Sequence, residues 1–226
     1  MYRILFLLLA LISISCSRYY EPPPQNLPLL SRRAEMQFSP SLSIYGGSVG
    51  CAFSPVKHLG INANAWQAFT KAKLGYGELA LGYYHGFHNQ LNFEVYGGYG
   101  RGASSMNDTI NNFFLRGDYY HGKGDFNNYF IQCNFGVDLD SSVFVAAGAR
   151  YVVMDYMASV IQKNGVTHYD ASFPGKGLEF SGLMRIGKRH IFGQCGGTIS
   201  FMRVDDPADM FRLSPLQIFV GMLIKF

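Results

Sequence analysis

The residues of this chain that could support hydrolytic chemistry lie in two polar stretches, 157–176 and 204–215. The first holds His168 and Asp170, and the second holds an aspartate pair that begins at Asp205. A histidine and a carboxylate placed opposite further carboxylates can activate a water molecule by general base catalysis. Acidic residues in polar loops are usually solvated, so we expect no catalytic residue and keep a small hydrolase as an alternative.

Two further motifs fail as chemical sites. His85 and His88 flank a short turn without a nearby cysteine or carboxylate set, so we expect no metal and interpret the pair as a solvated turn or interfacial anchor. A lipid A-modifying enzyme would need a Ser/His pair, and these histidines lie at the wrong end for it. The glycine-rich run 97–102 sits in a strand pattern with no helix after it, unlike a nucleotide loop. We expect no cofactor.

Five charged residues occupy the polar faces of alternating segments: Glu78, Glu94, Arg150, Glu179 and Arg185. Buried charges are tolerated when they are paired and hydrogen-bonded. We predict a salt-bridged charge network that fills the lumen of a narrow barrel, with a narrow solute or ion channel as the alternative. Eight-stranded barrels are filled by side chains, and sixteen-stranded ones leave a channel. A barrel of about ten strands is closer in size to the filled kind.

The last eleven residues carry the clearest strand pattern, because every second one is apolar: Leu216, Ile218, Val220, Met222, Ile224 and Phe226. Successive side chains of a strand point to opposite faces, so a period of two predicts a strand with one apolar face. About 9–11 residues is the length that a tilted strand needs to cross a bilayer.

A closing strand that ends on an aromatic residue resembles the C-terminal signature of outer-membrane β-barrels. The resemblance implies that 216–226 closes a transmembrane barrel and is recognised by the barrel assembly machinery. An Asp/His pair facing an Asp pair across the rim resembles, in turn, the water-activating site of the omptin proteases, which are ten-stranded barrels. This likeness is the source of the hydrolase alternative.

We predict a closed, antiparallel, up-and-down transmembrane β-barrel over residues 34–226, with about ten strands (8–12). The strands are expected near 35–45, 48–55, 59–69, 76–86, 91–102, 126–138, 143–156, 177–187, 191–203 and 216–226. Tight breaks alternate with long polar loops at 103–125, 157–176 and 204–215, as short periplasmic turns and longer external loops require. In lipid an open sheet edge is excluded, so the first strand must pair with the last.

Composition supports one membrane domain. The chain has 226 residues, a formal net charge of +4 and only 15% charged residues. A nucleic-acid partner would need a clustered basic face, so we expect none, and we expect a monomer in contact with outer-membrane lipids. Cys51, Cys133 and Cys195 each share a face with apolar neighbours, which favours free thiols.

The N-terminus reads as a targeting segment. Residues 1–15 combine a positive start with a short apolar run, which is typical of a signal peptide. The small residue before Cys16 resembles a bacterial lipobox, in which Cys16 would carry acyl chains such as palmitate; each buried CH₂ would contribute about 0.8 kcal/mol to anchoring. Prolines 22–24 favour an extended form. We predict that 16–33 is a periplasmic tether outside the core.

Three short segments of the mature chain resemble sequences of one group of outer-membrane barrel lipoproteins of the Bacteroidetes: Asn26-Leu27-Pro28-Leu29, residues 59–64 and residues 94–102. The resemblance implies location and fold and brings no known activity. We therefore expect a protein of the outer membrane of a Gram-negative bacterium, tethered on the periplasmic side. Its expected role is structural, or surface interaction through the external loops.

Overall fold

The computed structural model describes residues 23–69, 73–87, 91–112, 115–140, 142–163, 166–204 and 216–226. Within these ranges the backbone alone is described at 73, 106–112, 115–122, 158–163 and 166–171. The signal peptide, Cys16 and the start of the expected tether lie outside the described residues. No helix among the described residues is long and apolar enough to cross a membrane.

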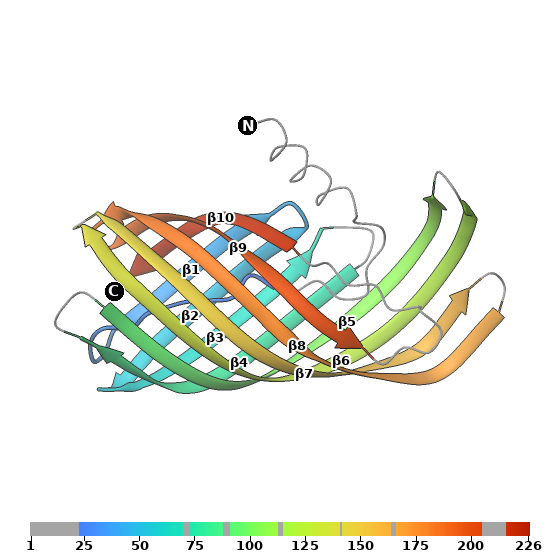
Figure 1. Ribbon diagram of the computed structural model, residues 1–226, viewed down its shortest axis with the longest axis horizontal. Coiled ribbons are helices and arrows are strands. Elements are labelled where there is room, and N and C mark those ends of the chain that lie inside the picture. Colours follow the sequence, from blue (N-terminus) through green and yellow to red (C-terminus); the bar gives the residue numbers. More distant parts are fainter. Residues whose placement is uncertain are drawn as a thin grey trace.

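Ten antiparallel strands follow one another around a single closed barrel, which confirms the predicted fold (Figure 1). Closure comes from β1 and β10, where Phe38 pairs with Ile224 and Leu42 with Val220. The strands are β1 (Met36–Ser43), β2 (Gly46–Val56), β3 (Leu59–Ala68), β4 (Lys73–Gly86), β5 (Leu91–Asn112), β6 (Leu115–Asp140), β7 (Val143–Lys163), β8 (Val166–Lys188), β9 (Ile191–Val204) and β10 (Leu216–Lys225).

The two faces of the wall differ as the alternation predicts. On β6, Ile131 is 60% exposed while the next residue, Gln132, is fully buried. The closing strand behaves in the same way, with Val220 exposed and Gln217 buried. Apolar side chains therefore cover the outside of the barrel, and polar, charged and aromatic side chains fill the inside.

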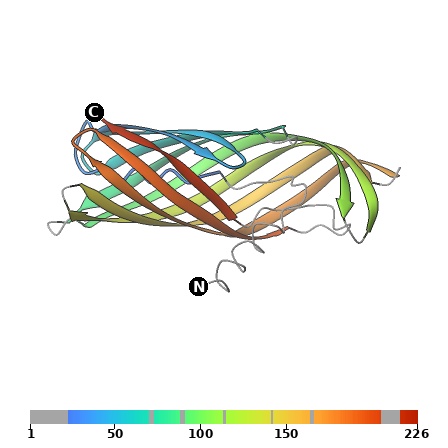
Figure 2. The same cartoon turned by 90° about the horizontal axis from the view of Figure 1, so that it is seen from above.

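Two of the expected loops are strands instead. The stretch 103–125 is the end of β5 paired with the start of β6, with Asn107 opposite His121. The stretch 157–176 is formed by β7 and β8 in the same way, and Tyr120 pairs with Lys163 between the two hairpins. These hairpins extend beyond the other strands (Figures 1 and 2). Apolar alternation missed them because these stretches are rich in Asn, Asp, Gly and Ser, which is typical of loops. Residues 205–215 of the third loop are not described.

The opposite end of the barrel carries only short connections, and we call it the short-turn end; the other is the hairpin end. At the short-turn end His58 stacks on Tyr83 and His85 with ring centroids 5.4 and 5.3 Å apart, and Phe87 meets the edge of His85 at 4.7 Å. His85 is therefore part of an aromatic rim, as an interfacial anchor would be. His88 lies outside the described residues.

The prediction that the proline-rich stretch stays outside the core is wrong for residues 23–30, which we call the lumenal segment. All eight of these residues are buried, and Leu27, Leu29 and Leu30 are at most 2% exposed. In Figure 1 this segment is the blue coil that precedes β1. Its apolar and amide side chains, rather than its prolines, decide its position, because the lumen offers partners to both kinds.

Candidate functional site: a filled lumen

A buried ion pair crosses the lumen between β7 and β4. The guanidinium of Arg150 donates to both carboxylate oxygens of Glu78, at 2.9 Å each. Arg150 Nε also donates to Gln132 Oε1 at 2.8 Å, and Arg150 Nη1 lies 3.9 Å from a carboxylate oxygen of Glu179. The guanidinium carbon sits 4.2 Å from the centre of the Phe130 ring. Charged donors are therefore matched with acceptors, as burial requires.

Strand register brings these groups together. Arg150 pairs directly with Gln132 on one side and with Glu179 on the other, and directly opposite side chains in a sheet have Cβ atoms about 5 Å apart. Glu78 reaches the same guanidinium from β4, across the barrel interior. The lumen of a ten-stranded barrel is thus narrow enough for one arginine to bridge.

The other two predicted network residues bind the lumenal segment instead. Glu94 accepts a hydrogen bond from the backbone N–H of Leu30 at 2.7 Å and from Asn134 Nδ2 at 2.9 Å. Arg185 donates from Nη2 to the carbonyl of Leu27 at 2.6 Å and from Nη1 to the carbonyl of Pro28 at 3.2 Å. All five predicted residues face the lumen, and Gln132 and Asn134 link Glu94 to the Arg150–Glu78 pair through hydrogen bonds.

Amide side chains hold the upstream part of the segment. Asn26 Nδ2 donates to Asn62 Oδ1 at 2.7 Å, and Asn62 Nδ2 returns a bond to the Asn26 carbonyl at 3.2 Å. Ser39 Oγ donates to Asn26 Oδ1 at 2.9 Å, and Asn64 Nδ2 donates to the carbonyl of Pro24 at 2.9 Å. Hydrogen bonds from β1 and β3 thus satisfy backbone and side-chain groups that burial would otherwise leave costly.

Inward glycines make room for the apolar side chains of the segment. A Cβ added at Gly148 would lie 2.6 Å from Leu27 Cδ2, and one added at Gly136 would collide with Leu29 Cδ1. Leu29 itself has a φ of 55°, a left-handed conformation that costs a leucine roughly 1–2 kcal/mol. The lumen is therefore shaped around this segment, which closes the half of the barrel nearest the short-turn end.

The half of the lumen nearest the hairpin end is lined on one side by a separate buried cluster. It is largely aromatic and draws on strands β3 to β8: Trp66, Ala68, Leu74, Tyr76, Ala80, Tyr96, Phe126, Phe130, Val152, Met154, Tyr156 and Phe173. Tyr76 stacks on Phe126 with centroids 5.6 Å apart. On the facing strands β9, β10, β1 and β2, the buried polar residues include Ser41, Ser48, Thr198 and Gln217.

Glu35, just before β1, clasps the end of the segment. Its carboxylate accepts hydrogen bonds from Ser31 N and Ser31 Oγ at 2.9 Å each and from Gln37 Nε2 at 2.6 Å, and Lys225 Nζ lies 3.8 Å away. Burial alone would raise the pKa of Glu35, but Lys225 and these hydrogen bonds outweigh it and hold the pKa below its ordinary value.

The candidate hydrolytic residues are not brought together by the described part of the structure. His168 and Asp170 belong to β8, where His168 pairs with Ile161, and their side chains are not described. Asp205 lies outside the described residues. Within the ranges given above, no group of three or more His, Cys, Asp or Glu side chains could hold a metal ion. Cys51, Cys133 and Cys195 are free thiols on separate strands.

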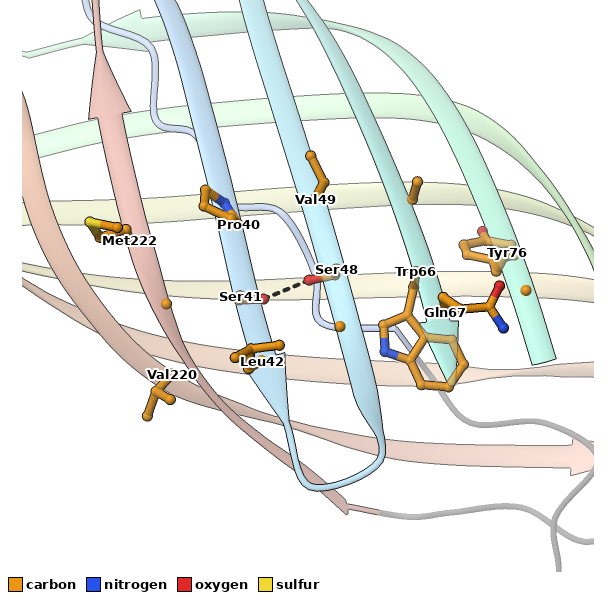
Figure 3. Close-up of a pocket in the computed structure, with 14 residues that line it drawn as sticks. Pro40, Ser41, Leu42, Ser48, Val49, Trp66, Gln67, Tyr76, Val220 and Met222 are labelled. Carbon is orange, nitrogen blue, oxygen red and sulfur yellow. Dashed lines mark hydrogen bonds between the residues drawn. The ribbon is translucent and has the colours of Figure 1, made fainter. Parts of the chain in front are cut away.

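An apolar groove of about 920 Å³ lies across β10 and β1 to β4. Leu42, Val49, Val220 and Met222 surround it (Figure 3). The β1–β10 ladder is interrupted between Phe38 and Ser41, on either side of Pro40, and a proline has no N–H to donate. The groove therefore lies beside this interruption of the closing seam.

Sequence reasoning missed the residues that receive the lumenal segment. Asn62, Asn64 and Gln132 are buried polar residues on β3 and β6, and each donates a hydrogen bond to the segment. The sequence signal for them was a set of amide side chains on the inward faces of β3 and β6.

The chain matches no family model and no curated protein. Among solved structures it is similar to the translocator domain of the autotransporter NalP from Neisseria meningitidis, with 13% sequence identity and a TM-score of 0.38. The match covers 85% of this chain and 86% of that one.

Proposed function

We propose that this chain is a monomeric β-barrel lipoprotein of a Gram-negative outer membrane, acylated at Cys16. Its role would be structural, or surface interaction through the two hairpins β5–β6 and β7–β8, without catalysis. Short turns of such barrels face the periplasm and longer connections face outward. On this assignment the short-turn end is periplasmic, and the closing strand β10 is the segment that the assembly machinery would recognise.

The filled lumen is the observation that carries this proposal. The lumenal segment closes the half nearest the short-turn end, the Arg150–Glu78 pair crosses the interior, and the aromatic cluster narrows the half nearest the hairpin end. A pore for general diffusion needs an open interior, which larger barrels have. The outward apolar side chains and the His58–Phe87 rim support a membrane setting, and lipid acyl chains would fill the groove beside Pro40.

A narrow channel is the second candidate, because part of the filling is a segment rather than the wall. Single-barrel conductance separates the two. The complete protein should give no conductance steps above background. A variant without residues 23–30 should conduct, provided that its unboiled and boiled samples still differ in electrophoretic mobility, as those of a folded barrel do. Stable steps from the complete protein that change in Glu94→Gln would overturn the filled-lumen proposal in favour of the channel.

A further inference from the structure

The direction in which the lumenal segment runs has a consequence for the lipid anchor. Pro24 is bound by Asn64, far along β3 from the short-turn end, whereas Leu30 is bound by Glu94 near the start of β5. Ser31 then meets Glu35 beside the first residue of β1. From Pro24 to Ser31 the chain therefore descends toward the short-turn end.

The geometry points to an N-terminus that leaves the barrel through the hairpin end, which places acylated Cys16 in the outer leaflet. We infer that the chain is threaded through its own lumen and anchored on the cell surface. This inference rests on the proposed function, which supplies the acyl group and the orientation, and it replaces the periplasmic tether that the sequence suggested.

The reach of the chain is sufficient. Residues 16 to 23 span at most about 24 Å when extended, at roughly 3.4 Å per residue. From the level of Asn64 the rest of β3, which ends at Ala68, rises only about 13 Å at about 3.3 Å per residue. Cys16 can therefore clear the rim. The short β1–β2 turn lies at this end of the barrel, close to the strands that hold Pro24 and Asn26.

The opposite route is closed by packing. To return to the short-turn end, the chain before Pro23 would have to pass beside Leu27, Leu29 and Leu30. These residues already touch the wall on several sides, packing with Phe144, Leu183 and Phe219 in one cluster and with Ala52 and Tyr84 in another. Since Gly148 has no room even for a methyl group beside Leu27, a second strand of chain does not fit.

The route toward the hairpin end is polar and has unused hydrogen-bonding capacity. Ser41, Ser48, Thr198 and Gln217 are buried on the side facing the aromatic cluster. Within the described residues, the buried Oε1 of Gln217 and Oγ of Ser200 have no hydrogen-bond partner. A backbone that passes through a lumen must have its N–H and C=O groups satisfied, and these atoms are suited to that task.

Single-cysteine labelling of intact cells tests the inference. In a background carrying Cys51→Ala, Cys133→Ala and Cys195→Ala, we would compare Ser17→Cys with two references. Ile44→Cys marks the hairpin end, where Ile44 is 68% exposed, and Lys57→Cys marks the exposed short-turn end. A membrane-impermeant maleimide should label Ser17→Cys to the same extent as Ile44→Cys, and should reach Lys57→Cys only after permeabilisation.

The failures are distinguishable. If Ile44→Cys is labelled but Ser17→Cys reacts only after permeabilisation, or in neither state, the threading is wrong while the barrel orientation stands. If Lys57→Cys is the residue labelled in intact cells, the orientation in the proposed function is inverted and the surface anchor fails with it. Palmitate incorporation that is lost in Cys16→Ala confirms the acyl group; no incorporation in the parent chain overturns the anchor.

Discussion

Arg185 on β8 donates a 2.6 Å hydrogen bond to the backbone carbonyl of Leu27, which stands 158 residues earlier in the chain. The same guanidinium also binds the carbonyl of Pro28 at 3.2 Å. A planar donor fork is suited to holding two neighbouring acceptors at once. An inward strand residue thereby fixes the backbone of a segment that belongs to no strand.

Arg185→Met should loosen the lumenal segment without altering the wall. Two buried carbonyls would lose their donor, and an unsatisfied buried group costs about 1–3 kcal/mol. On electrophoresis, we expect the band of the folded barrel to convert to the unfolded band at a lower sample temperature than in the wild type. We also expect intermittent steps in single-barrel conductance. Lys188→Met, which removes an exposed charge from the same strand, is the control and should change neither readout. Identical behaviour of the two variants would contradict the anchoring role.

The Arg150–Glu78 pair should behave as a coupled unit. Removing one partner of a buried pair leaves an uncompensated charge, at a cost of roughly 3–5 kcal/mol. We expect Arg150→Met to lower the free energy of unfolding by about that amount, and Arg150→Met with Glu78→Gln to lose less than the two single changes together. Urea unfolding in lipid vesicles measures all three variants. Strict additivity would show that the pair does not interact.

The sequence predicted the strands where apolar and polar residues alternate, and it failed to predict them where this alternation stops. Alternation located ten strands and assigned Glu94, Arg150 and Glu179 to the inner face, because a period of two follows directly from strand geometry. It missed the ends of β5 to β8, where neither face has to be apolar. Polar sequences of this kind are typical of loops. The extended sheet is seen only in the strand pairing, for example between Tyr120 and Lys163.

The lumenal segment could not be found by periodicity, because it has none. Its prolines suggested an exposed tether, yet Leu27 and Asn26 bind partners more than a hundred residues away, Arg185 and Gln132. Long-range hydrogen bonds of this kind leave no local pattern. The inward glycines Gly136 and Gly148, which make room for Leu29 and Leu27, were the available clue.

A methyl group at Gly148 should displace the segment, because the added Cβ would lie 2.6 Å from Leu27 Cδ2. Gly97→Ala is a matched control, since a Cβ there meets nothing within 4 Å. We expect Gly148→Ala to lower the temperature at which the folded band is lost on electrophoresis. We also expect it to increase the rate of hydrogen exchange at the amide of Leu30. If the two alanines have equal effects, the segment does not pack against β7 as described.

Ile131→Arg tests whether the outward face meets lipid. Ile131 lies in the middle of the wall, paired with Gly97 and Tyr151, and is 60% exposed. An arginine at the lipid face near the bilayer centre costs about 2–4 kcal/mol, whereas on a wet surface it would cost almost nothing. We expect Ile131→Arg, but not Ile131→Leu, to reduce the folded fraction in vesicles. An unaffected arginine variant would mean that this face is solvated.

Acid should weaken the clasp around Glu35. The pKa of this carboxyl is lowered below its ordinary value of 4.5, because Lys225 and the hydrogen bonds from Ser31 and Gln37 outweigh the effect of burial. A lowered pKa means that Glu35 stabilises the fold above pH 4.5 and that this contribution is lost as the pH falls through the folded-state value. The wild type should therefore exceed Glu35→Gln in urea midpoint at pH 7, and the two should converge at strongly acidic pH. A difference that persists or grows on acidification would show that the clasp does not depend on the charge of Glu35.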